Sequence, residues 1–329
     1  MARLFWRFGC TCVGLVERAA NADDKWVPPS VPAGVCFGFE PRSTVPLRYL
    51  RSGSGEPLEI DEGREPELSS LGRPIREWRP PRNPLHARLY RADKRFHLWI
   101  EGGGWFEIDP DRRAIRLPEG TDPLRREERL WGIPALLCFV RRGDVPLHGA
   151  AVEVDGGSLL LCGPSRAGKT TLAAAFLSAG HRVLSEDLGC CRLSPSPAVL
   201  PGPAMLRTRL DVYRRLSFPK TTVVGRDTER VHLALEDELR GDGRPVPLQG
   251  IVFLRKGARS RSERVRPEEA LPDLWALSLK LPLDQDRARC FHGLVQLVET
   301  VPIWNFHRPV SYRSLPSVVR ELARLCSES

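Results

Sequence analysis

The sequence lacks the features that mark several specialised classes of protein. It has no run of about 18 apolar residues, so no membrane-spanning helix and no membrane partner are predicted. It shows no internal repeat and no helix-turn-helix, zinc-finger or RNA-binding aromatic motif. The net charge of +9 comes mainly from arginines that are scattered along the chain among acidic residues. We therefore expect no nucleic-acid partner, although the charge suits an anionic ligand such as a nucleotide.

Cysteine pairs at metal-binding or disulfide-type spacing are also missing. The nine cysteines are irregularly spaced and include no C-x-x-C pair, so neither a zinc site nor a disulfide framework is predicted. Several lie in apolar runs, where they are expected to be small core residues. A signal peptide is not expected, because Arg7 interrupts the short apolar stretch at 1–16. These features predict a cytoplasmic protein.

The composition is otherwise that of an ordinary globular protein, with 41% hydrophobic and 28% charged residues in 329. Three parts are predicted: a loosely ordered lead-in (1–30), a smaller β-rich domain with a connecting helix (31–143), and an α/β domain (144–329). Short alternating runs separated by turn signals predict strands in the second part, and the proline-rich stretch 79–84 is expected to be a loop. The fold class expected for the chain is α/β.

The connecting segment 123–141 is predicted to be helical. Thr121 or Asp122 suits the N-cap and Pro123 suits the first helical position. Gly132 and Pro134 lie inside the segment, so a kink or a break is expected there. Beyond residue 145 the chain alternates between expected strands (150–154, 158–162, 183–184, 250–254, 301–306) and expected helices (167–179, 267–279, 287–300, 315–325).

The strongest motif is a phosphate-binding loop of the form G-x-x-x-x-G-K-[ST]. Its nucleotide-contacting residues are expected to be Gly163, Pro164, Ser165, Arg166, Ala167, Gly168, Lys169, Thr170 and Thr171. The glycines let backbone N–H groups turn toward phosphate oxygens, and the following helix presents its positive end to the same anion. Lys169 is expected on the β- and γ-phosphates, and the Thr170 hydroxyl on Mg²⁺. An apolar strand before the loop and a helix after it argue against a mere glycine-rich turn.

The nucleotide is expected to be ATP. Guanine-reading domains use an Asn-Lys-x-Asp segment, and the three asparagines, Asn21, Asn83 and Asn305, begin none. ATP together with Mg²⁺ is therefore the predicted cofactor pair.

Two further groups are expected beside the loop. A hairpin turning at Asp155-Gly156 brings His148 opposite Gly163 or Pro164, where an imidazole can contact the γ-phosphate or tune a nearby base. The alternative for His148 is a histidine held by backbone at a strand end. Glu186 and Asp187 end a strand about seventeen residues beyond Lys169, and a parallel strand would bring them to the ligand-binding edge of the sheet.

Adjacent carboxylates suit two roles, one in holding Mg²⁺ and one in accepting a proton from an attacking hydroxyl. Successive strand residues point to opposite faces, so one of the two is expected to face the metal directly. The alternative is a solvated acidic turn.

With these features the chain resembles an HPr kinase-type serine kinase, and more closely the HPr-kinase-like proteins of bacterial peptide-modification clusters, including lasso-peptide tailoring kinases. The resemblance is carried by residues 147–152, 163–170 and 180–187, and by the fifteen-residue step from His148 to Gly163. Weaker similarity extends through 201–207, 247–254 and 301–302.

The resemblance implies a P-loop fold related to HPr kinase and phosphoenolpyruvate carboxykinase, preceded by a small variable β domain. It implies ATP, Mg²⁺ and transfer of the γ-phosphoryl group to a serine of a peptide or small protein. The family's catalytic base falls on Glu186, where the family usually has aspartate, and its metal-associated acid falls on Asp187. The loop has Arg166-Ala167 where the family often has Gly-Ile or Gly-Val.

Several questions stay open at the level of sequence. Arg207, Arg209 or Arg226 could stabilise the transferred charge, or each could be a surface residue. A nucleotide-dependent switch without a phosphoacceptor, and a kinase of a small metabolite, remain alternative functions. A homo-oligomer, the acceptor's identity and a reverse reaction are likewise undecided.

Overall fold

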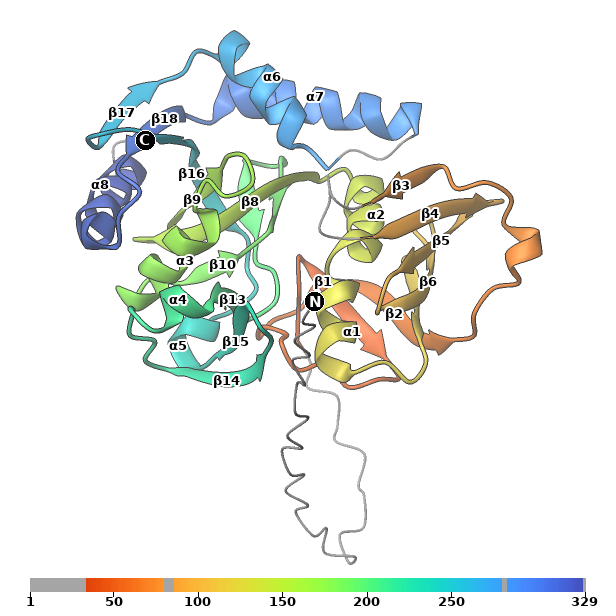
Figure 1. The fold of residues 1–329 in the computed structure, drawn as a ribbon. Helices are drawn as coiled ribbons and strands as arrows, with labels where there is room; N and C mark the ends of the chain where they lie inside the picture. The colour runs from red at the N-terminus through yellow and green to blue at the C-terminus, as the bar shows by residue number, and fades with distance from the viewer. Residues whose placement is uncertain (1–33, 80–85, 280–282, 328–329) are drawn as a thin grey trace, which may run out of the picture. The chain divides into compact units, whose positions relative to one another are not determined.

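Three β-sheets, flanked by helices, form the framework of the part of the chain that the structure describes (Figure 1). The structure is a computed structural model and describes residues 34–79, 86–279 and 283–327. Residues Val31–Ser329 form one unit, separate from Met1–Ser30. The expected lead-in and almost all of the expected proline-rich loop lie outside the described residues. The predicted α/β class is confirmed.

The first sheet has seven strands and contains only residues from the first half of the chain. Its order is β1-β2-β7-β6-β5-β4-β3. The strands are β1 (Phe39–Ser43), β2 (Glu56–Gly63), β3 (Arg76–Trp78), β4 (Ala87–Ala92), β5 (Arg95–Ile100), β6 (Gly104–Asp109) and β7 (Ala114–Pro118), with a short 3-10 helix at Leu68–Ser70. Alternate residues such as Phe96, Leu98 and Ile100 are buried, as the period-2 patterning predicts.

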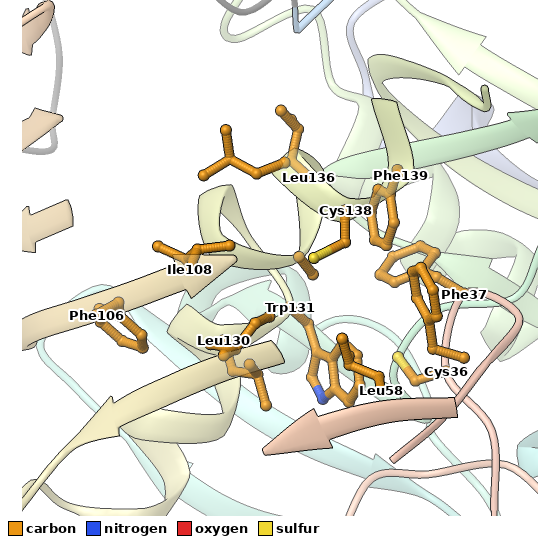
Figure 2. Packing of buried hydrophobic residues seen from close by; sticks show 14 of the residues in the cluster. Cys36, Phe37, Leu58, Phe106, Ile108, Leu130, Trp131, Leu136, Cys138 and Phe139 are labelled. Atoms are coloured by element: carbon orange, nitrogen blue, oxygen red, sulfur yellow. The ribbon is translucent and has the colours of Figure 1, made fainter. Parts of the chain in front are cut away.

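Two short helices cover this sheet, α1 (Pro123–Leu130) and α2 (Ile133–Arg142). The Asp122 side chain accepts a hydrogen bond from the Arg125 amide at 2.9 Å, which confirms it as the N-cap. The helices separate at Trp131-Gly132, where the break was predicted. Figure 2 shows Trp131, Cys138 and Phe139 packing toward strand residues such as Leu58 and Ile108.

The same hydrophobic cluster includes Leu188, Cys190 and Leu200 from the second half. The core of the β-rich part is therefore continuous with the α/β part, and the boundary at 143 stays a prediction. The seven cysteines that the structure describes are all buried, as core residues are expected to be.

The second sheet has eight strands and carries the phosphate-binding loop. They are β8 (Val145–Val154), β9 (Gly157–Cys162), β10 (Val183–Ser185), β11 (Leu188–Arg192), β12 (Ala198–Leu200), β16 (Val246–Lys256), β17 (Arg261–Arg264) and β18 (Ile303–Arg308). Strand β9 pairs antiparallel with β8 and parallel with β16, and β16 pairs parallel with β18. Strand β10 pairs antiparallel with β8. Strands β9, β10, β16 and β18 therefore end at the same edge of the sheet.

Helices cover both faces of this sheet. On one face α3 (Lys169–Ser178) and α8 (Leu315–Ser327), the latter preceded by a 3-10 turn at Tyr312–Ser314, pack on residues such as Val152 and Leu161. On the other face α6 (Pro267–Leu277) and α7 (Asp284–Thr300) pack on residues such as Leu160 and Phe253. A sheet buried on both faces requires nearly continuous apolar strands, and β9 is buried along its whole length.

A third sheet, of three strands, is formed by residues between the predicted strands 183–184 and 250–254, and this sheet was not predicted. It has the order β13-β15-β14 and comprises β13 (Met205–Arg209), β14 (Thr221–Arg226) and β15 (Arg230–Leu235), with the short helices α4 (Leu210–Tyr213) and α5 (Asp237–Arg240) beside it. Among the described residues no helix is long and apolar enough to cross a membrane.

A fully buried arginine ties the first half of the chain to strand β10. The Arg51 guanidinium donates to the carbonyl oxygens of Gly202 at 2.8 Å, Val183 at 2.7 Å and Leu184 at 3.3 Å, and also to that of Arg240. Burial lowers the pKa of Arg51 to about 10, which leaves it charged at neutral pH. Arg51 thus donates several hydrogen bonds to backbone carbonyl oxygens, two of which belong to β10, the strand that precedes Glu186.

Replacing Arg51 by methionine is expected to lower the free energy of unfolding by about 2–4 kcal/mol, because several buried carbonyl groups lose their donor. The loss is limited because a buried charge is removed at the same time. Urea denaturation measures it. Arg48→Met is the matched control, since Arg48 lies three residues away with an exposed side chain. Equal stability of the two variants would contradict a bracing role for Arg51.

Candidate active site

The phosphate-binding loop connects β9 to α3 at the shared sheet edge. Gly163 and Gly168 have φ values of +148° and +91°, which suit glycine, and Arg166 also has a positive φ of +65°. Gly168 is the N-cap of α3 and has no side chain that could accept from the first turn. The first N–H groups of a helix lack intrahelical partners, so those of α3 are suited to an anion. Pro164, Ser165 and Arg166 are exposed on this loop.

Lys169 lies inside the loop. Its ammonium nitrogen donates to the carbonyl oxygens of Gly163 at 2.9 Å and Pro164 at 3.2 Å, and the residue is only 6% exposed. Burial lowers the pKa of Lys169, while the charge of Asp187 acts to raise it. The lysine is thereby held within reach of the loop mouth, where it can exchange carbonyl oxygens for phosphate oxygens.

His148 reaches the position that the hairpin register predicts. Gly149 pairs with Cys162, which brings His148 level with Gly163. Its Nδ1 lies 3.2 Å from the backbone oxygen of Asp187, so Nδ1 is the donor and Nε2 carries no proton in the neutral ring. Burial, and secondly the charge of Lys169, lower the pKa of His148. The imidazole is therefore mainly neutral at pH 7. Its contact agrees with the backbone-held interpretation, and its role at the γ-phosphate stays a prediction.

Glu186 and Asp187 lie in a bend between β10 and β11, both of which pair antiparallel with β8. Strand β10 runs parallel to β9, as the sequence suggested, but the two are not direct neighbours, because β8 lies between them and pairs antiparallel with both. The acidic pair still reaches the edge that carries the loop, since β8 is the common neighbour of both strands.

The two carboxylates have different surroundings. Glu186 is 8% exposed, and its Oε2 accepts from the amide and the Nε of Arg207 at 2.8 and 3.1 Å. Its Oε1 accepts from Arg230 at 3.2 Å. Burial raises the pKa of Glu186 to about 7, Arg207 opposes this rise, and the charge of Asp187 adds to it. The Asp187 side chain is 45% exposed and also contacts the Arg207 guanidinium.

Arg207 is the centre of this cluster. Besides Glu186 and Asp187 it contacts Glu128 of α1. Burial acts to lower the pKa of Arg207, but the three carboxylates outweigh it and raise the pKa above its ordinary value. Within the part of the chain that the structure describes, Arg207 is the one of the three arginines considered from the sequence that contacts the acidic pair. Arg209 is bound to Asp211 at 3.1 Å, and Arg226 lies over the Tyr213 ring.

Sequence reasoning missed four residues of this site: Glu128, Arg230, His232 and Arg308. His232 lies across from Arg207 in the β13–β15 pair, 3.9 Å from Glu128 and 3.8 Å from Asp227. Arg308 donates to the loop carbonyl of Ala167 at 2.9 Å. A prediction of the β13–β15 strand pairing would have pointed to Arg230 and His232, but no local signal marks Glu128 or Arg308.

The residues present suit a magnesium-bound nucleotide. Thr170 is half-buried at the second position of α3, and Asp187 offers an exposed carboxylate whose charge acts on Lys169. Among the described residues no group of three or more His, Cys, Asp or Glu side chains forms a metal cage. Mg²⁺ at nucleotide sites is usually held by one or two protein oxygens, the phosphates and water, so such a cage is not required.

Comparison with known proteins identifies no family. No protein-family description matches the chain, and no curated protein matches it. Among solved structures, the Hpr(Ser) kinase/phosphatase from Coxiella burnetii is similar at 11% identity with a TM-score of 0.28, over 54% of this chain and 88% of that one. The chain therefore has a distant structural likeness to this kinase/phosphatase. A TM-score this low does not establish a shared fold, and the HPr-kinase subgroup stays a prediction.

Proposed function

We propose that the protein is an ATP-dependent kinase that transfers the γ-phosphoryl group to a serine hydroxyl of a peptide or small protein. The observation that supports this most is the convergence of three elements on one sheet edge: the loop with Lys169, His148 of β8, and the Glu186-Asp187 bend. A nucleotide switch needs the loop alone. A carboxylate beside the loop is what transfer to a hydroxyl requires in addition.

The loop residues 163–171 bind the phosphates through backbone N–H groups, and Lys169 neutralises the β- and γ-phosphate oxygens. Thr170 and Asp187 would hold Mg²⁺ through their oxygens. The chemistry that Mg²⁺ would supply there is positive charge that offsets the negative charge developing on the transferred phosphoryl group. Arg207 keeps Asp187 and Glu186 in place from the side of the small sheet.

In the transfer step, the serine oxygen forms a bond to the γ-phosphorus while the bond to the bridging oxygen of ADP breaks. The serine proton passes to Glu186, whose pKa of about 7 suits a base at neutral pH. Neutral His148, held by the Asp187 backbone oxygen, orients groups at the γ-phosphate with its free Nε2.

The direct test is incubation with ATP, Mg²⁺ and a panel of serine-containing peptides and small proteins encoded beside this gene, followed by mass spectrometry. The expected product carries one phosphoryl group on serine, and the same peptide with that serine replaced by alanine stays unmodified. ATP hydrolysis without any modified acceptor would favour the switch. Phosphorylation of a small metabolite, with none of the peptides or small proteins modified, would favour the metabolite kinase. Either result would contradict the proposal.

A further inference from the structure

Arg308 lies at the end of β18, on the same sheet edge as the phosphate-binding loop. Strand β18 pairs parallel with β16, and β16 pairs parallel with β9, which leads into the loop. Arg308 is only 3% exposed, so its charge is removed from bulk water. A buried arginine normally has a carboxylate partner that offsets the cost of this burial.

Arg308 has no such partner among the residues described. Its Nη2 donates to the Ala167 carbonyl at 2.9 Å and its Nη1 to the Pro309 carbonyl at 3.3 Å. No acidic side chain of the described ranges forms an ion pair with it, whereas the neighbouring Arg255 is paired with Asp273. Burial alone lowers the pKa of Arg308, and no anionic group acts on it in return. Its positive charge is thus uncompensated.

The loop is shaped around this guanidinium. A Cβ on Gly168 would collide with Nη2 of Arg308, and Gly168 has a φ of +91°. Glycine suits this position because of its backbone conformation, and a larger side chain there would displace the Arg308 guanidinium. The Arg308 guanidinium therefore packs directly against the loop at Ala167 and Gly168.

Two cations hold the loop from within. Lys169 takes the carbonyl oxygens of Gly163 and Pro164, and Arg308 takes that of Ala167. With its carbonyl oxygens held by cations, the loop can turn its N–H groups outward as an anion-binding nest. We infer that Arg308 is a positioning residue of the nucleotide site, which orients the Ala167 peptide and supplies positive charge that a bound polyphosphate neutralises. This inference rests on the nucleotide site of the proposed function.

The inference predicts effects of opposite sign on stability and on binding. Arg308→Gln removes an uncompensated buried charge, so the melting temperature of the nucleotide-free protein is expected to stay equal or to rise. The affinity for ATP is expected to fall about 10- to 100-fold, as for the loss of a charge-assisted interaction. A purely structural arginine would behave in the reverse way, with a lower melting temperature and an unchanged stabilisation by ATP.

The experiment is isothermal titration of wild type, R308Q and R308K with ATP, ADP, AMP and adenosine, beside melting curves without and with ATP. The loss in R308Q is expected to grow with the number of phosphates, and R308K is expected to recover part of it. R255Q is the matched control, because Arg255 lies one residue before the end of the adjacent strand β16 and its charge is already paired. R255Q should bind all four ligands as the wild type does.

Three outcomes would overturn the inference. Equal ATP affinity in R308Q and wild type would overturn the inference while leaving the proposed function intact. A failure of R308Q to fold would also overturn it, because the charge would then be a stabilising one. A wild-type protein that binds no nucleotide would overturn both the inference and the proposed function.

Discussion

Replacing Lys169 by alanine is expected to abolish ATP turnover. The ammonium group lies between the Gly163 and Pro164 carbonyl oxygens, 2.9 and 3.2 Å away. Its removal deletes the cation that meets the β- and γ-phosphates and frees two loop carbonyl oxygens to repel them. We expect turnover to fall by at least about a hundredfold, measured as ADP release under saturating Mg²⁺.

Lys94→Ala serves as the control, since Lys94 is an exposed residue at the β4–β5 turn of the first sheet. Its turnover should match that of the wild type. Melting curves of both variants separate a loss of chemistry from a loss of structure. If Lys169→Ala kept its nucleotide affinity and activity, the loop from Gly163 to Thr170 would not be a nucleotide site.

Replacing Glu186 by glutamine is expected to stop phosphoryl transfer while ATP binding stays near that of the wild type. Glutamine has the same shape and can still accept from the Arg207 amide, but it cannot take a proton from serine. Lys169 is held by the carbonyl oxygens of Gly163 and Pro164 rather than by Glu186, so the phosphate contacts should survive. Single-turnover transfer and nucleotide titration measure the two effects separately.

The pH dependence offers a second readout of the same residue. Burial, opposed by Arg207 and reinforced by Asp187, raises the pKa of Glu186 to about 7. A base must be deprotonated, so kcat/KM of the wild type is expected to rise as the pH passes through about 7 and then to level off. Asp187→Asn is expected to lower the overall rate, because Asp187 is also proposed to hold Mg²⁺. In its residual activity the rising limb should shift toward lower pH, because removal of a negative neighbour lowers the pKa of Glu186.

A Glu186→Gln variant that retains full transfer activity would show that the base is a different group, and Asp187 and His148 would be the remaining candidates. The glutamate at this position is one methylene longer than the aspartate that the resemblance leads one to expect. In the structure that extra length allows the carboxylate to contact both Arg207 and Arg230. The same contacts would also suit a residue that only stabilises the three-stranded sheet. Single-turnover transfer and nucleotide titration of Glu186→Gln distinguish this structural role from that of a base.

The parts of the site that are contiguous in sequence could be predicted from it. The loop from Gly163 to Thr170 needs only glycine at positions of positive φ and a strand and helix on either side, and all of these are local properties. The hairpin at Asp155-Gly156 follows from turn chemistry, and its register follows from counting residues away from the turn. The N-cap at Asp122 and the break at Gly132 are equally local.

The partners of these residues could not be predicted, because they come from distant segments. Glu128 contacts Arg207 across 79 positions and Arg308 contacts Ala167 across 141. Such contacts depend on which strands become neighbours and on how α1 packs, and these are set by burial of the whole apolar surface. The different surroundings of Glu186 and Asp187 have the same origin. Local sequence was thus sufficient to predict the loop and the position of His148 beside it, whereas the charged residues that surround them are brought together by long-range packing.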